Sequence, residues 1–99
     1  PRINPVDGLY TEEEIEKIEH ETLNAILIGQ TQKVKALYLK IETMFNQGGD
    51  YTKSLIANKF IFPISSILER NYEWGKEYLE LFPKKLRLEY LRQINSSTI

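Results

Sequence analysis

The stretch that decides the fold is Phe60-Ile61-Phe62-Pro63-Ile64-Ser65-Ser66-Ile67-Leu68, which is the most apolar part of the chain. A proline inside a helix removes one hydrogen bond and clashes with the carbonyl four residues earlier, at a cost of about 3 kcal/mol. The apolar residues nevertheless keep one helical spacing from residue 55 to residue 68. This spacing predicts a single helix that is kinked at Pro63, with a strand over residues 59–62 as the alternative.

Two further helices precede this stretch. Thr11-Glu12-Glu13-Glu14 has the pattern of a capping box, which predicts a helix that starts at Thr11 and stops near Gly29. The second helix carries one apolar stripe at spacings of three and four residues, and Gly48-Gly49 end it. The residues of this stripe are Val34, Leu37, Tyr38, Ile41, Met44 and Phe45.

The remaining chain is predicted to form a last helix in two parts. Asn71 separates the kinked helix from residues 72–81, and Pro83 suits the first turn of a segment that continues to Ile94. Residues 1–10 are expected to form an irregular leader, and residues 95–99 a frayed tail. The predicted fold is an all-α antiparallel four-helix bundle, with the third helix kinked at Pro63 and the last divided at Pro83.

Composition supports one folded domain over residues 1–99, because 41% of the residues are hydrophobic and 27% are charged. The formal net charge is only -1, but it is unevenly distributed. Residues 12–21 hold six glutamates and one lysine, whereas residues 84–92 hold four cations and one glutamate. These segments are expected to form helix faces that attract each other, or the basic one can meet an acidic partner or a phospholipid surface.

Cysteine is absent, which excludes disulfides and thiol catalysis. No apolar run approaches the roughly 18 residues that span a bilayer, and the start of the sequence lacks a signal-peptide pattern. We therefore expect a cytoplasmic protein. The chain begins at Pro1, which fits either a processed N-terminus or a fragment of a longer protein.

No motif indicates catalysis, a cofactor or a small-molecule substrate. Glu12, Glu16 and His20 share one helix face, but that face lies opposite the apolar stripe, so a solvated surface is expected rather than a metal site. The serines lack a nucleophile elbow, and Gly48-Gly49 is not part of a phosphate-binding loop. Nucleic-acid binding is not expected, because the strongly acidic first helix would repel phosphates. The sequence predicts a protein that is not an enzyme.

Aromatic and basic residues are the remaining candidates for contact with a protein partner. Tryptophan and tyrosine are enriched at interface hot spots, and three of them fall within residues 72–78. The candidate partner-binding residues are Phe62, Tyr72, Trp74, Tyr78, Lys84, Lys85, Arg87 and Arg92. A groove is expected if Trp74 lies exposed beside the kink at Pro63.

The segment Ala36-Leu37-Tyr38-Leu39-Lys40-Ile41-Glu42, followed by a polar turn and an apolar helix, resembles the second and third helices of bacteriocin immunity proteins of the enterocin A immunity type. The similarity covers residues 31–68. It implies a bacterial, cytosolic protein that forms an antiparallel four-helix bundle. It also implies that the protein protects its producer cell by binding a protein partner, one form of which is a membrane-embedded receptor complex. It also implies recognition by the C-terminal helix, here residues 84–92. The two prolines and the acidic first helix depart from the family pattern. The alternative is a helical adaptor or docking domain from a larger protein.

Overall fold

The computed structural model describes residues 10–96, and its regular structure is entirely helical. The helices are α1 (Glu12–Leu27), α2 (Thr31–Gln47), α3 (Asp50–Ile56), α4 (Phe62–Arg70), α5 (Tyr72–Glu80) and α6 (Lys84–Ser96), and a π-helical turn, η1 (Ala57–Ile61), joins α3 to α4. The all-α prediction is therefore confirmed for this part of the chain, and the alternative strand over residues 59–62 is wrong. The predicted leader and tail lie outside the described residues, apart from Tyr10 and residues 95–96, and the last two belong to α6.

Helix α1 begins with the capping box that the sequence predicts. The Glu14 amide donates to the Thr11 hydroxyl at 3.1 Å, and the Thr11 amide donates to the Glu14 carboxylate at 2.8 Å. These bonds satisfy two amides that have no partner within the helix. At the other end, Gly29 has a φ of 76°, a left-handed conformation that a glycine adopts without strain and that turns the chain into α2.

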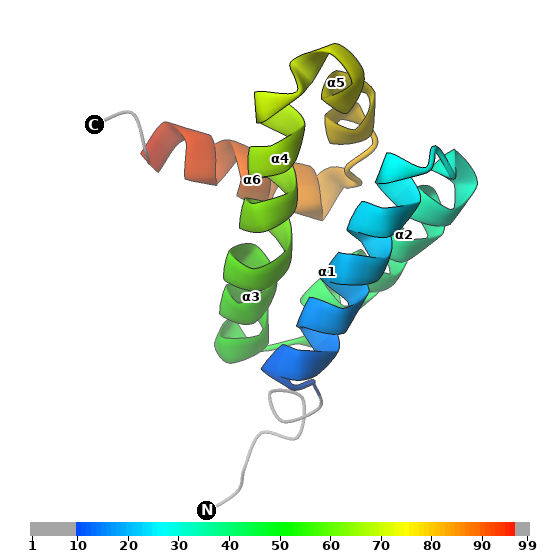
Figure 1. The fold of residues 1–99 in the computed structure, drawn as a ribbon. Helices are drawn as coiled ribbons and strands as arrows, with labels where there is room; N and C mark the ends of the chain where they lie inside the picture. The colour runs from blue at the N-terminus through cyan, green and yellow to red at the C-terminus, as the bar shows by residue number, and fades with distance from the viewer. Residues whose placement is uncertain (1–9, 97–99) are drawn as a thin grey trace, which may run out of the picture.

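Helices α1 and α2 form a hairpin, and the rod made by α3, η1 and α4 lies beside it (Figure 1). The predicted stripe of α2 is buried from Val34 to Met44, although Phe45 is only partly buried. Tyr38 is fully buried at the centre of the core and packs against the rings of Phe60 and Phe82, with 4.8 Å between its centroid and that of Phe82. These three rings join α2, the rod and the α5–α6 connection.

The kink predicted at Pro63 is not confirmed. The irregularity lies one turn earlier, in η1, where the Phe62 amide donates to the Ala57 carbonyl five residues back. Ile61 and Phe62 keep helical backbone angles, and Pro63 occupies the first turn of α4. A π turn contains one residue more than a regular helical turn. The extra residue moves the preceding carbonyls away from the positions at which they would clash with the proline ring. The helix can therefore continue through Pro63.

Helix α5 folds back sharply after Asn71 and packs closely on α4. The Asn71 side chain donates to the Ile67 carbonyl at 2.9 Å and closes the last turn of α4. The two helices approach most closely at Gly75, where an added Cβ would lie 2.2 Å from the Leu68 carbonyl oxygen. A glycine is therefore required at this position.

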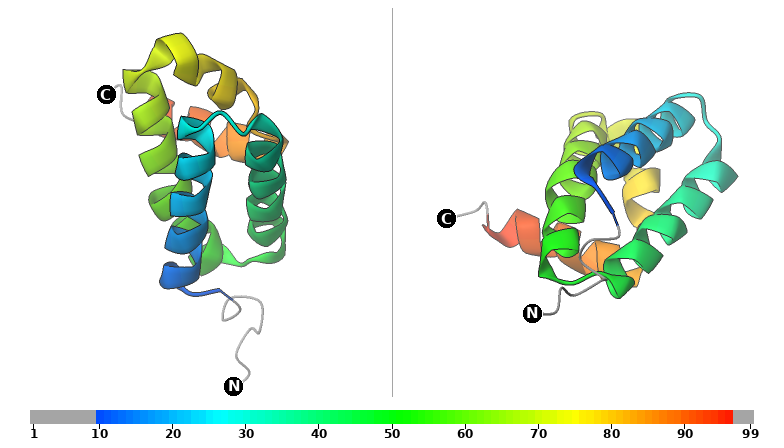
Figure 2. Two further views of the ribbon diagram at one scale, coloured as in Figure 1. Left: turned by 45° about the vertical axis from the view of Figure 1, so that its right-hand side comes forward. Right: turned by 90° about the horizontal axis from the view of Figure 1, so that it is seen from below.

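The chain breaks around Pro83 as predicted, but α5 and α6 are not two halves of one helix along the bundle. Helix α6 runs across the rod rather than beside it, and only its first turns reach α2, whereas α5 crosses above the hairpin (Figures 1 and 2). The antiparallel arrangement of four helices is not confirmed. The physical reason is the set of contacts that hold α6 against α2 and η1, described next.

Candidate partner-binding surface

The first turn of α6 is held by contacts to α2 and α5. The Glu42 carboxylate on α2 accepts from the Lys85 amide at 2.8 Å, which places a negative charge where the helix dipole favours one. The Arg87 guanidinium donates to the Glu80 carbonyl at 2.6 Å, at the end of α5. Leu86 is fully buried between these two contacts. The start of α6 is therefore fixed in both position and direction.

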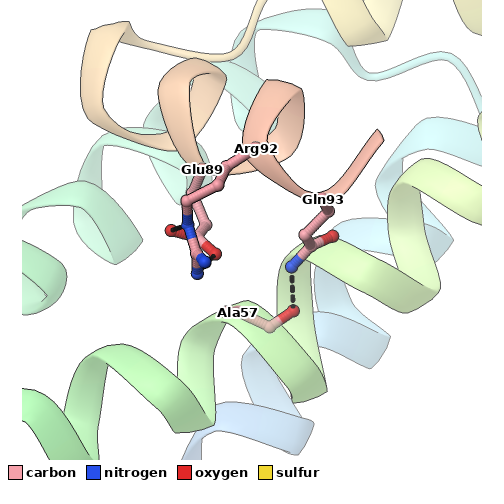
Figure 3. A network of polar contacts seen from close by, with 4 residues as sticks. All are labelled: Ala57, Glu89, Arg92 and Gln93. Atoms are coloured by element: carbon pink, nitrogen blue, oxygen red, sulfur yellow. Dashed lines mark hydrogen bonds and ion pairs between the residues drawn. The ribbon is translucent and has the colours of Figure 1, made fainter. Parts of the chain in front are cut away.

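The second half of α6 is held by α4 and the π turn. The Tyr90 hydroxyl donates to the Glu69 carboxylate at 2.5 Å, and burial together with this bond raises the pKa of Tyr90. The Gln93 amide donates to the Ala57 carbonyl at 2.9 Å (Figure 3). Ala57 belongs to η1. The Ala57 carbonyl, which the π turn leaves accessible, therefore forms a hydrogen bond with Gln93 of the same molecule.

Anchoring these inner residues leaves the opposite side of α6 exposed. Leu88 is 53% exposed and Leu91 is 45% exposed, and both share a helix face with Lys84. Cations flank the two leucines. We call this surface the outer face of α6, and it consists of Lys84, Lys85, Arg87, Leu88, Leu91 and Arg92.

The cations of the outer face differ in how they are paired. Arg92 forms an ion pair with Glu89 at 2.5 Å, which raises the pKa of the arginine (Figure 3). Arg87 is engaged by the carbonyls at the end of α5. Within residues 10–96, the side chains of Lys84 and Lys85 form no ion pair. These two lysines therefore carry the positive charge that a partner can reach.

The four predicted aromatic residues lie in different environments. Phe62 is 59% exposed and lines a groove of about 340 Å³ between α4 and α6. Tyr72 is exposed, with the Lys76 ammonium 6.0 Å from the centre of its ring. Tyr78 is buried, and its carbonyl accepts from the Tyr38 hydroxyl at 3.0 Å. We therefore leave Tyr78 out of the exposed surface.

Trp74 does not share a groove with Pro63. It lines a hollow with Leu27 and Ile28, next to the α1–α2 turn. Pro63 instead lines a groove between α1 and α4, where Phe62 is its neighbour. The structure therefore separates the predicted aromatic residues and brings together the four basic ones on α6.

Sequence reasoning missed Leu88 and Leu91 as surface residues. Neither leucine is assigned to a surface from the sequence, and the inward side of α6 runs through Leu86, Tyr90 and Gln93. A signal was available, because Lys84, Leu88 and Leu91 are spaced by four and three residues and therefore define a second face. Only the contacts of α6 decide which face is buried.

Several side chains of the acidic face of α1 lie beside a cation or an imidazole. Lys59 lies 3.2 Å from the Glu12 carboxylate and 3.9 Å from that of Glu16, and His20 lies 3.4 Å from Glu19. In the part of the chain that the structure describes, no three histidine or acidic side chains are grouped so that they could hold a metal ion. Over the same residues, no helix has both the length and the apolar character needed to cross a bilayer.

Residues 3–96 match the model of a family described as a domain of unknown function, DUF7674. The chain belongs to this family. No curated protein and no solved structure matches the chain. Because the DUF7674 match extends to residue 96, it includes α6 together with the helices that hold it. The outer face of α6 is therefore part of the family domain.

Proposed function

We propose that this DUF7674 protein acts without catalysis, by binding a protein partner through the outer face of α6. The observation that carries the proposal is the exposure of Leu88 and Leu91 on a helix that several polar contacts hold in place. Exposed apolar side chains on a rigid helix lose little conformational freedom when they bind. Such a helix supports association better than a mobile segment with the same residues.

The charge around the two leucines indicates the chemistry of the partner. Lys84 and Lys85 lie at the N-terminal end of the outer face and form no ion pair with residues 10–96, so the partner should place acidic groups around an apolar centre. A groove that accepts one face of a helix meets this description. The groove beside Phe62 borders α6 and can extend the contact.

The most specific form of the proposal is bacteriocin immunity in the cytoplasm of a bacterium. The partner would then be the membrane-embedded complex through which the peptide forms pores. In this form, α1, α2, the α3–η1–α4 rod and α6 take the parts of the four helices of the immunity-type bundle, with α6 turned across the others. The use of a C-terminal helix for recognition agrees with the exposed outer face.

A helical adaptor or docking domain from a larger protein is the second candidate. The same exposed leucines favour it, because they require only a partner groove and no bacteriocin. The two candidates differ in their genetic context. An immunity gene should lie beside a gene for a short secreted peptide, whereas an adaptor domain would belong to a longer reading frame.

The test is protection of a sensitive bacterial strain against the neighbouring peptide. The full chain should protect, and the double variant Lys84→Glu, Lys85→Glu should lose protection at unchanged helicity by circular dichroism. Glutamates at the start of a helix are favoured by its dipole, so the fold should persist. Lys35→Glu, Lys40→Glu on the exposed side of α2 is the matched control and should protect normally. Full protection by the α6 variant, or the lack of any neighbouring peptide gene, would contradict the immunity role.

A further inference from the structure

A second exposed apolar surface lies at the α1–α2 turn. Leu27 is 61% exposed and Ile28 is 63% exposed, and Trp74 on α5 is 40% exposed beside them. Together they surround a hollow of about 600 Å³. Figure 2 shows the turn and α5 at the same end of the molecule. We call Leu27, Ile28 and Trp74 the apolar tip.

Two of the three residues of the apolar tip, Leu27 and Ile28, lie in the part of the sequence that is poorest in charge. Residues 22–32 form the longest stretch of the chain without a charged residue. The charges at its two borders neutralise each other, because Lys33 lies 3.8 Å from the Glu21 carboxylate. Glu77 adds one negative charge at the edge of the hollow. The surroundings of the tip therefore carry no excess of positive charge.

Four amides of the turn already have hydrogen-bond partners inside the molecule. The amides of residues 28, 29, 30 and 31 all donate to backbone carbonyls, at 3.1, 3.1, 2.9 and 3.0 Å. An amide that enters hydrocarbon without a partner costs several kcal/mol, which normally keeps turns out of lipid. At this turn, none of these four amides would lose a hydrogen bond to water.

The apolar tip is too small to form a stable contact between two copies of the chain by itself. Three side chains with these exposures can remove on the order of 300 Å² from water on this side, whereas a stable interface removes about 800 Å² from each partner. Shallow insertion into a bilayer has no such minimum area, and tryptophan favours the boundary between lipid and water. The balance of bordering charges fits a neutral headgroup better than an anionic one.

We propose that the apolar tip docks reversibly on a zwitterionic lipid surface by inserting Leu27, Ile28 and Trp74. The proposal does not depend on the function proposed above, because it uses none of the residues of the outer face of α6. The chain provides its own reporter, since Trp74 is the sole tryptophan in the sequence.

The experiment adds phosphatidylcholine vesicles to the full chain and records tryptophan fluorescence and vesicle flotation. The emission of Trp74 should shift to shorter wavelength, and the chain should float with the vesicles. Leu27→Glu and Ile28→Glu should each weaken partitioning roughly tenfold or more. Leu39→Glu is the matched control, because Leu39 is 57% exposed in the middle of α2, and it should partition normally.

Three results would overturn the proposal. The first is an unchanged emission spectrum with no flotation. The second is flotation that requires anionic lipid and is lost in Lys84→Glu, Lys85→Glu, which would assign lipid contact to α6. The third is a dimer that depends on Leu27 and Ile28 in sedimentation and binds no vesicles, which would make the apolar tip a contact between two copies of the chain.

Discussion

At the scale of single residues, Glu19 is an acidic side chain of α1 whose pKa is changed by its surroundings. Glu19 is only 7% exposed on α1, and its carboxylate has the imidazole of His20 at 3.4 Å. Burial raises the pKa of Glu19, His20 opposes this effect, and Glu16 adds to it. Because the raised pKa means that the folded protein binds this proton more tightly than the unfolded chain, the charged form of Glu19 opposes folding.

Glu19→Gln should therefore stabilise the protein at neutral pH. The stability that Glu19 contributes is present below about pH 4.5, its ordinary pKa, and is lost as the pH rises through the higher folded value. The free energy of unfolding of the variant should equal or fall below that of the parent at acid pH and exceed it at pH 7. Urea unfolding at several pH values measures this difference.

Glu13→Gln, on the exposed side of α1, is the control for removing a charge from this helix. An equal effect of both substitutions on the free energy of unfolding would exclude burial as the cause.

At the scale of elements, the π turn and α6 depend on each other. Helix η1 provides a carbonyl, at Ala57, that accepts from both the Phe62 amide and the Gln93 side chain. Without the irregular turn, the equivalent carbonyl would be enclosed by a regular helix ladder. The π turn thus contributes to the position of α6, together with the contacts that α2 and α5 make with its first turn.

Gln93→Ala should loosen α6 from η1. The expected loss in the free energy of unfolding is at most about 1 kcal/mol, because only one neutral hydrogen bond disappears and the Ala57 carbonyl keeps its bond to Phe62. Removing the buried Gln93 Oε1, which has no hydrogen-bond partner among the described residues, offsets part of this loss. Amide hydrogen exchange in α6 should accelerate more than exchange in α1. Arg92→Lys is the adjacent control, because it keeps a cation beside the largely buried Glu89 carboxylate of the same helix, and it should change stability little. Equal exchange in both variants would show that Gln93 does not anchor α6.

At the scale of the whole molecule, local patterns predict the helices better than their arrangement. The capping box at Thr11 and the stripe of α2 are determined by neighbours in sequence, so both are visible without a structure. The direction of α6 depends on the contacts of Lys85 with Glu42 and of Gln93 with Ala57, which span 43 and 36 residues and leave no periodic signal. The basic residues of the outer face could be predicted because charged side chains are normally exposed. Its exposed leucines could not, because their spacing does not tell which face of α6 is buried.

The long-range contacts lead to a prediction about cooperativity. The Tyr38, Phe60 and Phe82 rings join α2, the rod and the α5–α6 connection, and the Tyr38 hydroxyl bonds to the backbone of α5. The parts that these rings join cannot open without breaking the aromatic contact, so residues 10–96 should unfold as one domain. Trp74 reports on α5 and the adjoining α1–α2 turn, whereas far-ultraviolet circular dichroism reports on all helices. The two signals should give the same urea midpoint. An earlier midpoint for Trp74 would mean that α5 separates first, and Tyr38→Phe should then lower that early midpoint further, because it removes the bond from the Tyr38 hydroxyl to the Tyr78 carbonyl.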